Sequence, residues 1–199
     1  MAFTDYTAFK STVADYLARS DLTTQIPDFI TLAENRLRRD VRIRPMLKVV
    51  TTETVASDPT VSLPSDFLEM RDLHIDANPI HTLIYQNPSN FFRNAKAGTL
   101  TGGYPNNYTI MGSEFQFAPI PDSNYTLRMV YYAAPAYLSS TNTSNNFLAY
   151  CPDLLLYAAL GEAEPYLMND ARITTWATLY DRGLDSLTQS NDAGENPSA

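Results

Sequence analysis

Few side chains in this sequence have the type and spacing that catalysis needs, and the best placed lie around His74. Asp72 and Asp76 flank it at two residues on either side, and residues two apart on a strand share a face. A carboxylate there could orient the imidazole, as in Ser-His-Asp sites, whose members need not be close in sequence. The sequence has no G-x-S-x-G elbow. We therefore favour a surface histidine between solvated acids, with a hydrolase as an alternative.

Other residues that could do chemistry favour structural roles. Glu162 and Glu164 would diverge by roughly 200° on a helix, so we expect a solvated helix face there. The stretch GTLTGGY (residues 98–104) lacks the Lys-Ser/Thr of a phosphate-binding loop and indicates an exposed loop. Cys151 precedes a proline at a predicted helix start and is interpreted as a half-buried structural thiol. Two histidines are too few for a histidine metal centre, so we assign no catalytic residue, cofactor or metal.

One segment departs from the background in its charge. It carries six cations against the single acid Asp40, namely Arg36, Arg38, Arg39, Arg42, Arg44 and Lys48. Residues 150–199, by contrast, carry two arginines and eight acids. The basic segment is open to three interpretations: a solvated helix end, a contact with an acidic surface of another copy or another protein, or a contact with nucleic acid phosphates without base reading.

The composition favours a protein with extensive interfaces. The 199 residues carry a net charge of −8, only 18% charged residues and 13 tyrosines. Arginine outnumbers lysine, and interfaces are enriched in Tyr and Arg and depleted in Lys. One cysteine excludes an internal disulfide, and neither a secretory signal nor an apolar run of about 18 residues is present. We therefore expect no membrane association and a reducing cytoplasm as the place of synthesis.

The hydrophobic periodicity predicts helices at both ends of the chain and strands between them. Apolar residues recur at helical spacing in residues 4–19, 27–40, 152–168 and 171–189. Between them the period falls to two, with Phe115 and Phe117 on one face of a strand and Leu127, Met129 and Tyr131 on one face of another. We expect Asp170 to cap the last helix. The predicted fold is α+β: a four-helix bundle from residues 1–45 and 150–189, an inserted antiparallel β-rich domain at 46–149, and an extended C-terminal tail at 190–199.

The order of these segments resembles the head-to-tail adaptor (connector) proteins of tailed bacteriophages, of the type of tail tubular protein A in short-tailed phages. The segments that carry the likeness are IPDFITLAENRLRRDVR, LPSDFLEMRDLHI, YPNNYTIMGSEFQFAPIPDSNYTLRMVYYAAPAYLS and NNFLAYCPDLLLYAALGEAEPYLMNDARITTWATLYDRGL. The likeness as a whole covers roughly residues 4–187. None of them is as specific as a metal signature, so the likeness depends on their order and spacing.

The resemblance implies a structural virion protein without enzymatic activity. Such adaptors form a twelve-fold ring at the head-tail junction, between the portal protein and the tail or nozzle protein, with a central channel for the genome. The basic segment then becomes a candidate for contacts between subunits or for transient, non-specific contact with genomic DNA. Assembly in the bacterial host cytoplasm is implied, and no membrane. The last helix and tail become candidates for portal docking, namely Arg182, Leu184, Leu187, Asn191 and Glu195.

An alternative function is a carbohydrate- or ligand-binding β module on a helical stalk. Sugar rings stack on exposed aromatic faces, and Tyr104, Tyr108 and Tyr125 lie in or beside predicted loops and strands of the β-rich region. This alternative requires that these tyrosines present their rings to solvent.

Overall fold

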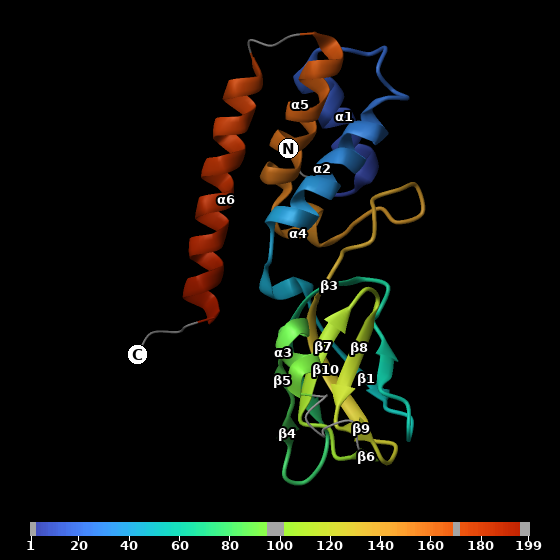
Figure 1. Ribbon diagram of the computed structural model, residues 1–199. Coiled ribbons are helices and arrows are strands. Elements are labelled where there is room, and N and C mark those ends of the chain that lie inside the picture. The colour runs from blue at the N-terminus through green and yellow to red at the C-terminus, as the bar shows by residue number, and fades with distance from the viewer. Residues whose placement is uncertain (1–2, 95–101, 169–171, 196–199) are drawn as a thin grey trace. The chain divides into compact units, whose positions relative to one another are not determined.

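The computed structural model describes residues 3–94, 102–168 and 172–195. The chain divides into two compact units (Figure 1). The helical unit consists of Met1–Met46 and Ala134–Ala199, and the β unit of Leu47–Ala133. Residues 134–149 thus belong with the helices, whereas the sequence analysis places them in the β-rich region.

The helical unit is built from segments at both ends of the chain. Its elements are α1 (Tyr6–Leu17), α2 (Ile26–Asp40), the 3₁₀ turn η1 (Arg44–Met46), α4 (Asn146–Tyr150), α5 (Pro152–Leu167) and α6 (Ile173–Glu195). Local signals set their ends: the Asp5 side chain caps α1 by accepting from the Ala8 N–H at 2.9 Å. Pro27 and Pro152 lie in the first turns of α2 and α5, where no backbone donor is needed.

The predicted four-helix bundle is wrong, although the α+β class is confirmed. One helix, α5, is buried on most of its circumference, and α1, α2, α4 and α6 each pack against it (Figure 1). A four-helix bundle shares its core between four helices of similar amphipathic character. The run LLLYAAL in α5 instead provides apolar side chains on several faces, so the other helices surround it.

The last helix, α6, lies alongside α5 and is mostly exposed. Among the residues of α6 with described side chains, only Tyr180 is buried. The helix continues to Glu195, so residues 190–195 are helical and not the extended tail that the sequence predicted. The absence of glycine or proline between Gly183 and Gly194 lets the helix propagate through this polar stretch. The predicted cap at Asp170 and residues 196–199 lie outside the described residues.

The β unit contains ten strands and one helix within the described residues. They are β1 (Leu47–Glu53), β2 (Thr60–Ser62), β3 (Phe67–Ile75), β4 (His81–Thr82), β5 (Ile84–Tyr85), α3 (Pro88–Asn94), β6 (Gly102–Gly103), β7 (Asn107–Met111), β8 (Glu114–Ala118), β9 (Ile120–Pro121) and β10 (Thr126–Ala133). One sheet has the order β1-β10-β3-β4 and is antiparallel throughout, and a second has the order β2-β8-β7-β5. A short parallel pair joins β6 and β9.

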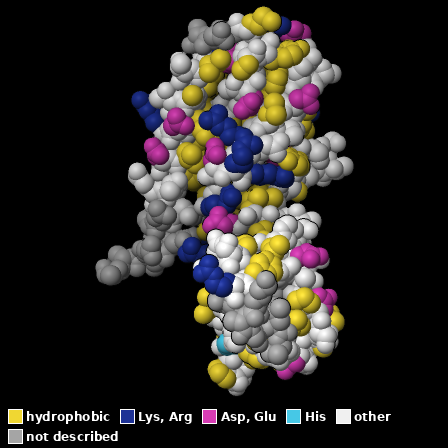
Figure 2. Space-filling model, in the orientation of Figure 1, with side chains coloured by type: hydrophobic (Ala, Val, Ile, Leu, Met, Phe, Trp, Pro, Cys, Tyr) yellow, Lys and Arg dark blue, Asp and Glu magenta, His cyan; other side chains and the backbone are white. Residues whose placement is uncertain are grey.

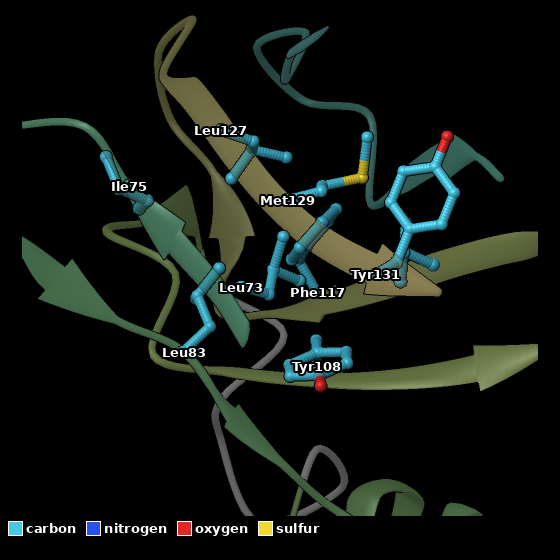
Figure 3. Packing of buried hydrophobic residues seen from close by; sticks show 9 residues of the cluster. Leu73, Ile75, Leu83, Tyr108, Phe117, Leu127, Met129 and Tyr131 are labelled. Atoms are coloured by element: carbon cyan, nitrogen blue, oxygen red, sulfur yellow. The ribbon is translucent and has the colours of Figure 1, made fainter. Parts of the chain in front are cut away.

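Side chains from both four-stranded sheets form the core of the β unit (Figure 3). Leu127, Met129 and Tyr131 of β10 point into it, as their alternation predicts, and Phe115 and Phe117 of β8 face them. The predicted faces of both strands are therefore confirmed. Among the described helices of the whole chain, none combines the length and the apolarity that a bilayer crossing requires.

Candidate interaction surfaces

The basic segment begins on the last turns of α2, where Arg36 contacts α6. Its guanidinium carbon lies 4.0 Å from the centre of the Tyr180 ring, and its Nε lies 3.7 Å from Asp40 Oδ2. The Tyr180 hydroxyl donates to the same carboxylate oxygen at 2.8 Å. Burial, together with the hydrogen bond to Asp40, raises the pKa of Tyr180 well above its usual value. Arg36 therefore helps to hold α6 on α2 within one chain.

Arg38 is directed into the loop that precedes α4. Its guanidinium stacks on the Tyr137 ring at 3.5 Å and donates a hydrogen bond to the Pro135 carbonyl. Its Nε is buried and has no hydrogen-bond partner among the described atoms. Such stacking suits the planar, weakly hydrated guanidinium. Arg38 is therefore a structural residue of this chain, which the sequence could not show because its contacts lie about a hundred residues away.

Glu34, one turn before Arg38, is buried under the same loop. Its carboxylate accepts from the Leu138 N–H at 3.0 Å and from Asn145 Nδ2 at 2.6 Å. Burial raises the pKa of this carboxyl against the lowering effect of these hydrogen bonds and of Arg38. Asn145 in turn caps α4 by accepting from the Leu148 N–H. Together, Glu34 and Arg38 fix the loop on α2.

Two further cations of the segment also make contacts within the chain. Arg42 Nη1 donates to the carbonyls of Arg38 and Val41 at 2.8 Å, which satisfies groups at the end of α2. In the β unit, Lys48 Nζ lies 2.7 Å from Asp66 Oδ2, and the Tyr131 hydroxyl donates to the other oxygen. Burial alone would raise the pKa of Asp66, but these hydrogen bonds lower it.

Arg39 and Arg44 are the remaining cations of the segment, and both are exposed. Neither side chain makes a hydrogen bond or an ion pair with another described residue. Figure 2 shows Lys and Arg side chains on the visible face of the helical unit, with Asp and Glu side chains among them. Of the six cations named as candidates for inter-subunit or DNA contacts, four are therefore engaged by other groups of the chain and Arg39 and Arg44 are not.

Arg44 lies at an open groove of the helical unit. The groove has a volume of about 280 Å³ and is lined by Ile43, Arg44, Pro45, Tyr150, Leu187, Ser190 and Asn191. The Arg44 N–H donates to Asn191 Oδ1 at 3.0 Å, which links η1 to the end of α6. Tyr150 is 60% exposed at its edge. The groove is at the lower end of the size of small-molecule sites and is open, so it suits side chains of a protein better than a cofactor.

The predicted portal-docking residues lie on different sides of α6. Arg182 is exposed, whereas Leu184, Leu187 and Asn191 are half-buried on the side that packs on the rest of the unit. Glu195 is the last residue of the helix, and its side chain lies outside the described atoms. Of the four docking candidates whose side chains are described, only Arg182 is exposed to solvent.

A buried contact between α5 and α6 was missed by the sequence analysis. Glu164 is fully buried and accepts from Trp176 Nε1 at 2.9 Å, and Arg172 Nε lies 3.2 Å from the same oxygen. The expectation of a solvated helix face is therefore wrong for Glu164. The signal was present in the arginine and tryptophan that follow within twelve residues, since a hairpin of two helices brings such residues together.

The residues considered for catalysis are integrated into the fold. His74 Nδ1 lies 2.7 Å from Asp72 Oδ2, so a carboxylate does orient this imidazole. The pair lies on β3, and its register neighbours at His74 are Arg128 and Thr82. Cys151 is 2% exposed, so it is fully buried and not half-buried as predicted, and burial raises the pKa of its thiol to about 12, as suits a structural thiol. No group of three or more metal-ligating side chains occurs within the described part of the chain.

The tyrosines proposed for sugar stacking do not form an exposed platform. Tyr108 is buried in the core of the β unit, so the expectation of an exposed ring there is wrong (Figure 3). Tyr104 packs its ring between His81 at 4.9 Å and Tyr125 at 4.8 Å. Tyr125 donates its hydroxyl hydrogen to Asp122.

Gly102 and Gly103, part of the predicted exposed loop, pair with β9, and the rest of that loop up to residue 101 lies outside the described residues.

A family model described as SU10 adaptor protein matches residues 4–198, which is nearly the whole chain and covers both units. A search of curated proteins finds no match.

Proposed function

We propose that this chain, which belongs to the SU10 adaptor protein family, forms a ring between the portal and the tail of a phage virion, around a channel for the genome. Family membership makes the chain a structural adaptor protein of a virion that acts between portal and tail proteins. Adaptors of this kind are not typically enzymes, so the Asp72–His74 pair takes a structural role in this proposal.

The finer features of the proposal follow the resemblance to head-to-tail adaptors, including those of the tail tubular protein A type. We assign twelve copies to the ring and assembly in the bacterial host cytoplasm. The β unit faces the tail or nozzle protein. The basic segment contributes contacts between subunits or transient, non-specific contacts with genomic DNA, through Arg39 and Arg44, since the other cations are held within the chain.

The helix α6 supports a role in portal docking. It is 23 residues long, and among its described side chains only Tyr180 is buried while the others are exposed or half-buried. A long exposed helix with few buried residues is a suitable element for binding a partner in a groove. The single observation that carries the proposed function remains the family match over residues 4–198.

Electron microscopy of the chain mixed with the portal protein of the same phage tests this function. End-on views should show a ring of twelve adaptor copies below the portal. Arg182→Glu should weaken portal binding by about tenfold, because Arg182 is the exposed member of the docking set. Arg93→Glu, at an exposed arginine of α3 in the β unit, is the matched control and should bind normally. A chain that is absent from virions and does not bind the portal protein would overturn the proposal.

A further inference from the structure

Two surfaces of the helical unit carry exposed charges of opposite sign. Arg39 and Arg44 are exposed and unpaired with any described acid, and they lie on α2 and η1. On α6, Asp181 and Asp185 are exposed and lie one turn apart, so they face the same side of the helix. The residues of the first surface thus offer two guanidinium groups, and those of the second offer two carboxylates.

The acidic pair and the groove lie on opposite sides of the same helix. Leu187 lines the groove, and it follows Asp185 by two residues. Two residues correspond to about 200° of rotation along an α-helix, so Asp185 points nearly away from the groove. The helix α6 therefore has one side that closes the groove beside Arg44 and another that carries the acids. A contact between unlike faces repeats from copy to copy in one direction, as in a ring.

We propose that Asp181 and Asp185 on α6 of one copy dock at Arg44, on the rim of the groove of the next copy, and at Arg39, in the last turn of its α2. This inference rests on the proposed ring and names the surfaces that join its subunits. The occupant is a second copy because its Asp181 and Asp185 carry charges complementary to Arg44 on the groove rim and to Arg39. Pro45, Tyr150 and Leu187 add apolar contact around Arg44, which ion pairs alone would lack. Isolated exposed ion pairs contribute little, whereas pairs at the rim of an apolar contact also set orientation.

Charge reversal followed by rescue tests the docking. The variants are Arg39→Glu with Arg44→Glu, Asp181→Arg with Asp185→Arg, and all four together, with Arg182 unchanged. Each double variant should weaken self-association by about tenfold or more, as measured by analytical ultracentrifugation over a concentration series, and the quadruple variant should restore it. If the basic residues instead bind DNA, the arginine variant loses DNA binding and the quadruple variant does not regain self-association. That result would overturn the inference.

Disulfide trapping provides a second readout that does not need a stable ring. Arg44→Cys protein mixed with Asp185→Cys protein should form a cross-linked pair on mild oxidation. The matched control is Asp15→Cys, which places the thiol at an exposed acid of α1. The native Cys151 is buried and does not compete. Equal yields from Asp185→Cys and Asp15→Cys would overturn the interface. If the charge-reversed variants form rings as the wild type does, the proposed interface is overturned and the adaptor function still stands.

Discussion

The neighbouring helices α5 and α6 are held in the helical unit by different forces. Leu155, Ala158 and Leu160 of α5 are each 0% exposed, and this helix is fixed by apolar contacts on most sides. Among its described side chains the helix α6 has one that is buried, Tyr180, and its contacts with the unit include polar ones, such as those of Tyr180 with Asp40 and of Trp176 with Glu164. Apolar burial is non-directional, whereas each of these polar contacts needs one partner in one place.

This difference separates a helix that builds the core from one that can serve a partner. A helix held by burial presents little surface to other proteins. A helix held by a few contacts along one side keeps the rest of its circumference available, as Arg182, Asp181 and Asp185 are on α6. Variants that weaken one kind of contact and not the other can therefore test the comparison.

Leu155→Ala should produce the largest loss of stability. Leu155 is 0% exposed in α5, so the substitution leaves a cavity in the core, and we expect a decrease of about 2–5 kcal/mol in the free energy of unfolding. Urea denaturation followed by circular dichroism measures this. Leu32→Ala on α2, where the leucine is 48% exposed, is the control and should change stability by less than about 0.5 kcal/mol. Equal effects of the two variants would contradict the central position of α5.

Trp176→Phe should cost less, about 1–3 kcal/mol. It removes the indole N–H that donates to Glu164, and a fully buried carboxylate then loses a hydrogen bond. Urea denaturation reports the loss, and hydrogen exchange locates it in α6. Tyr16→Phe keeps the ring that meets Trp176 edge-on and should have little effect. Unchanged protection of the α6 amides in Trp176→Phe would contradict the view that polar contacts hold this helix.

Tyr180→Phe should lower the free energy of unfolding by about 0.5–1.5 kcal/mol. The ring stays buried and Arg36 can still stack on it, so only the hydrogen bond to Asp40 is lost. Thermal unfolding should show a correspondingly lower midpoint. Tyr150→Phe, at a tyrosine that is 60% exposed, is the matched control and should unfold like the wild type.

The smallest expected effect is a pH dependence from Glu34. Burial raises the pKa of Glu34 in the folded chain above its unfolded value, so the folded state binds a proton more tightly. The contribution of Glu34 to stability is therefore fully present below the unfolded pKa and is lost as the pH rises through the folded pKa. Glu34→Gln keeps an acceptor for Leu138 N–H and removes the titration. The free energy of unfolding of the wild type, relative to that of Glu34→Gln, should thus be higher at pH 4 than at pH 7. A difference that grows with pH instead would contradict the raised pKa.

The sequence predicted the local elements well because their causes are local. The apolar spacing in residues 27–40 predicted a helix that the structure places at Ile26–Asp40, and the alternation at Phe115 and Phe117 predicted which face of β8 is buried. The α+β class follows from the change of period along the chain. These features depend on residues within a few positions of one another.

The remaining features depend on contacts that no local pattern contains. Arg38 looks like an interface residue in the sequence, yet it meets Tyr137 and Pro135 in a distant loop. Glu164 looks solvated until Trp176 folds over it. The central position of α5 likewise depends on how the other helices distribute around an apolar segment, which periodicity alone does not give. The sequence therefore predicted how many charges the basic segment carries. Which of its arginines are unpaired could be learned only from the structure.

The β unit begins and ends on adjacent strands, with Leu47 opposite Tyr132 in the ladder between β1 and β10. The polypeptide therefore departs from the helices and comes back to them through two backbone points only one strand spacing apart. A module attached in this way can be lengthened, shortened or exchanged for another without rethreading the rest of the chain. Selection for a different binding partner of the β unit can thus change residues 47–133 while the helices keep their own pattern of buried apolar residues.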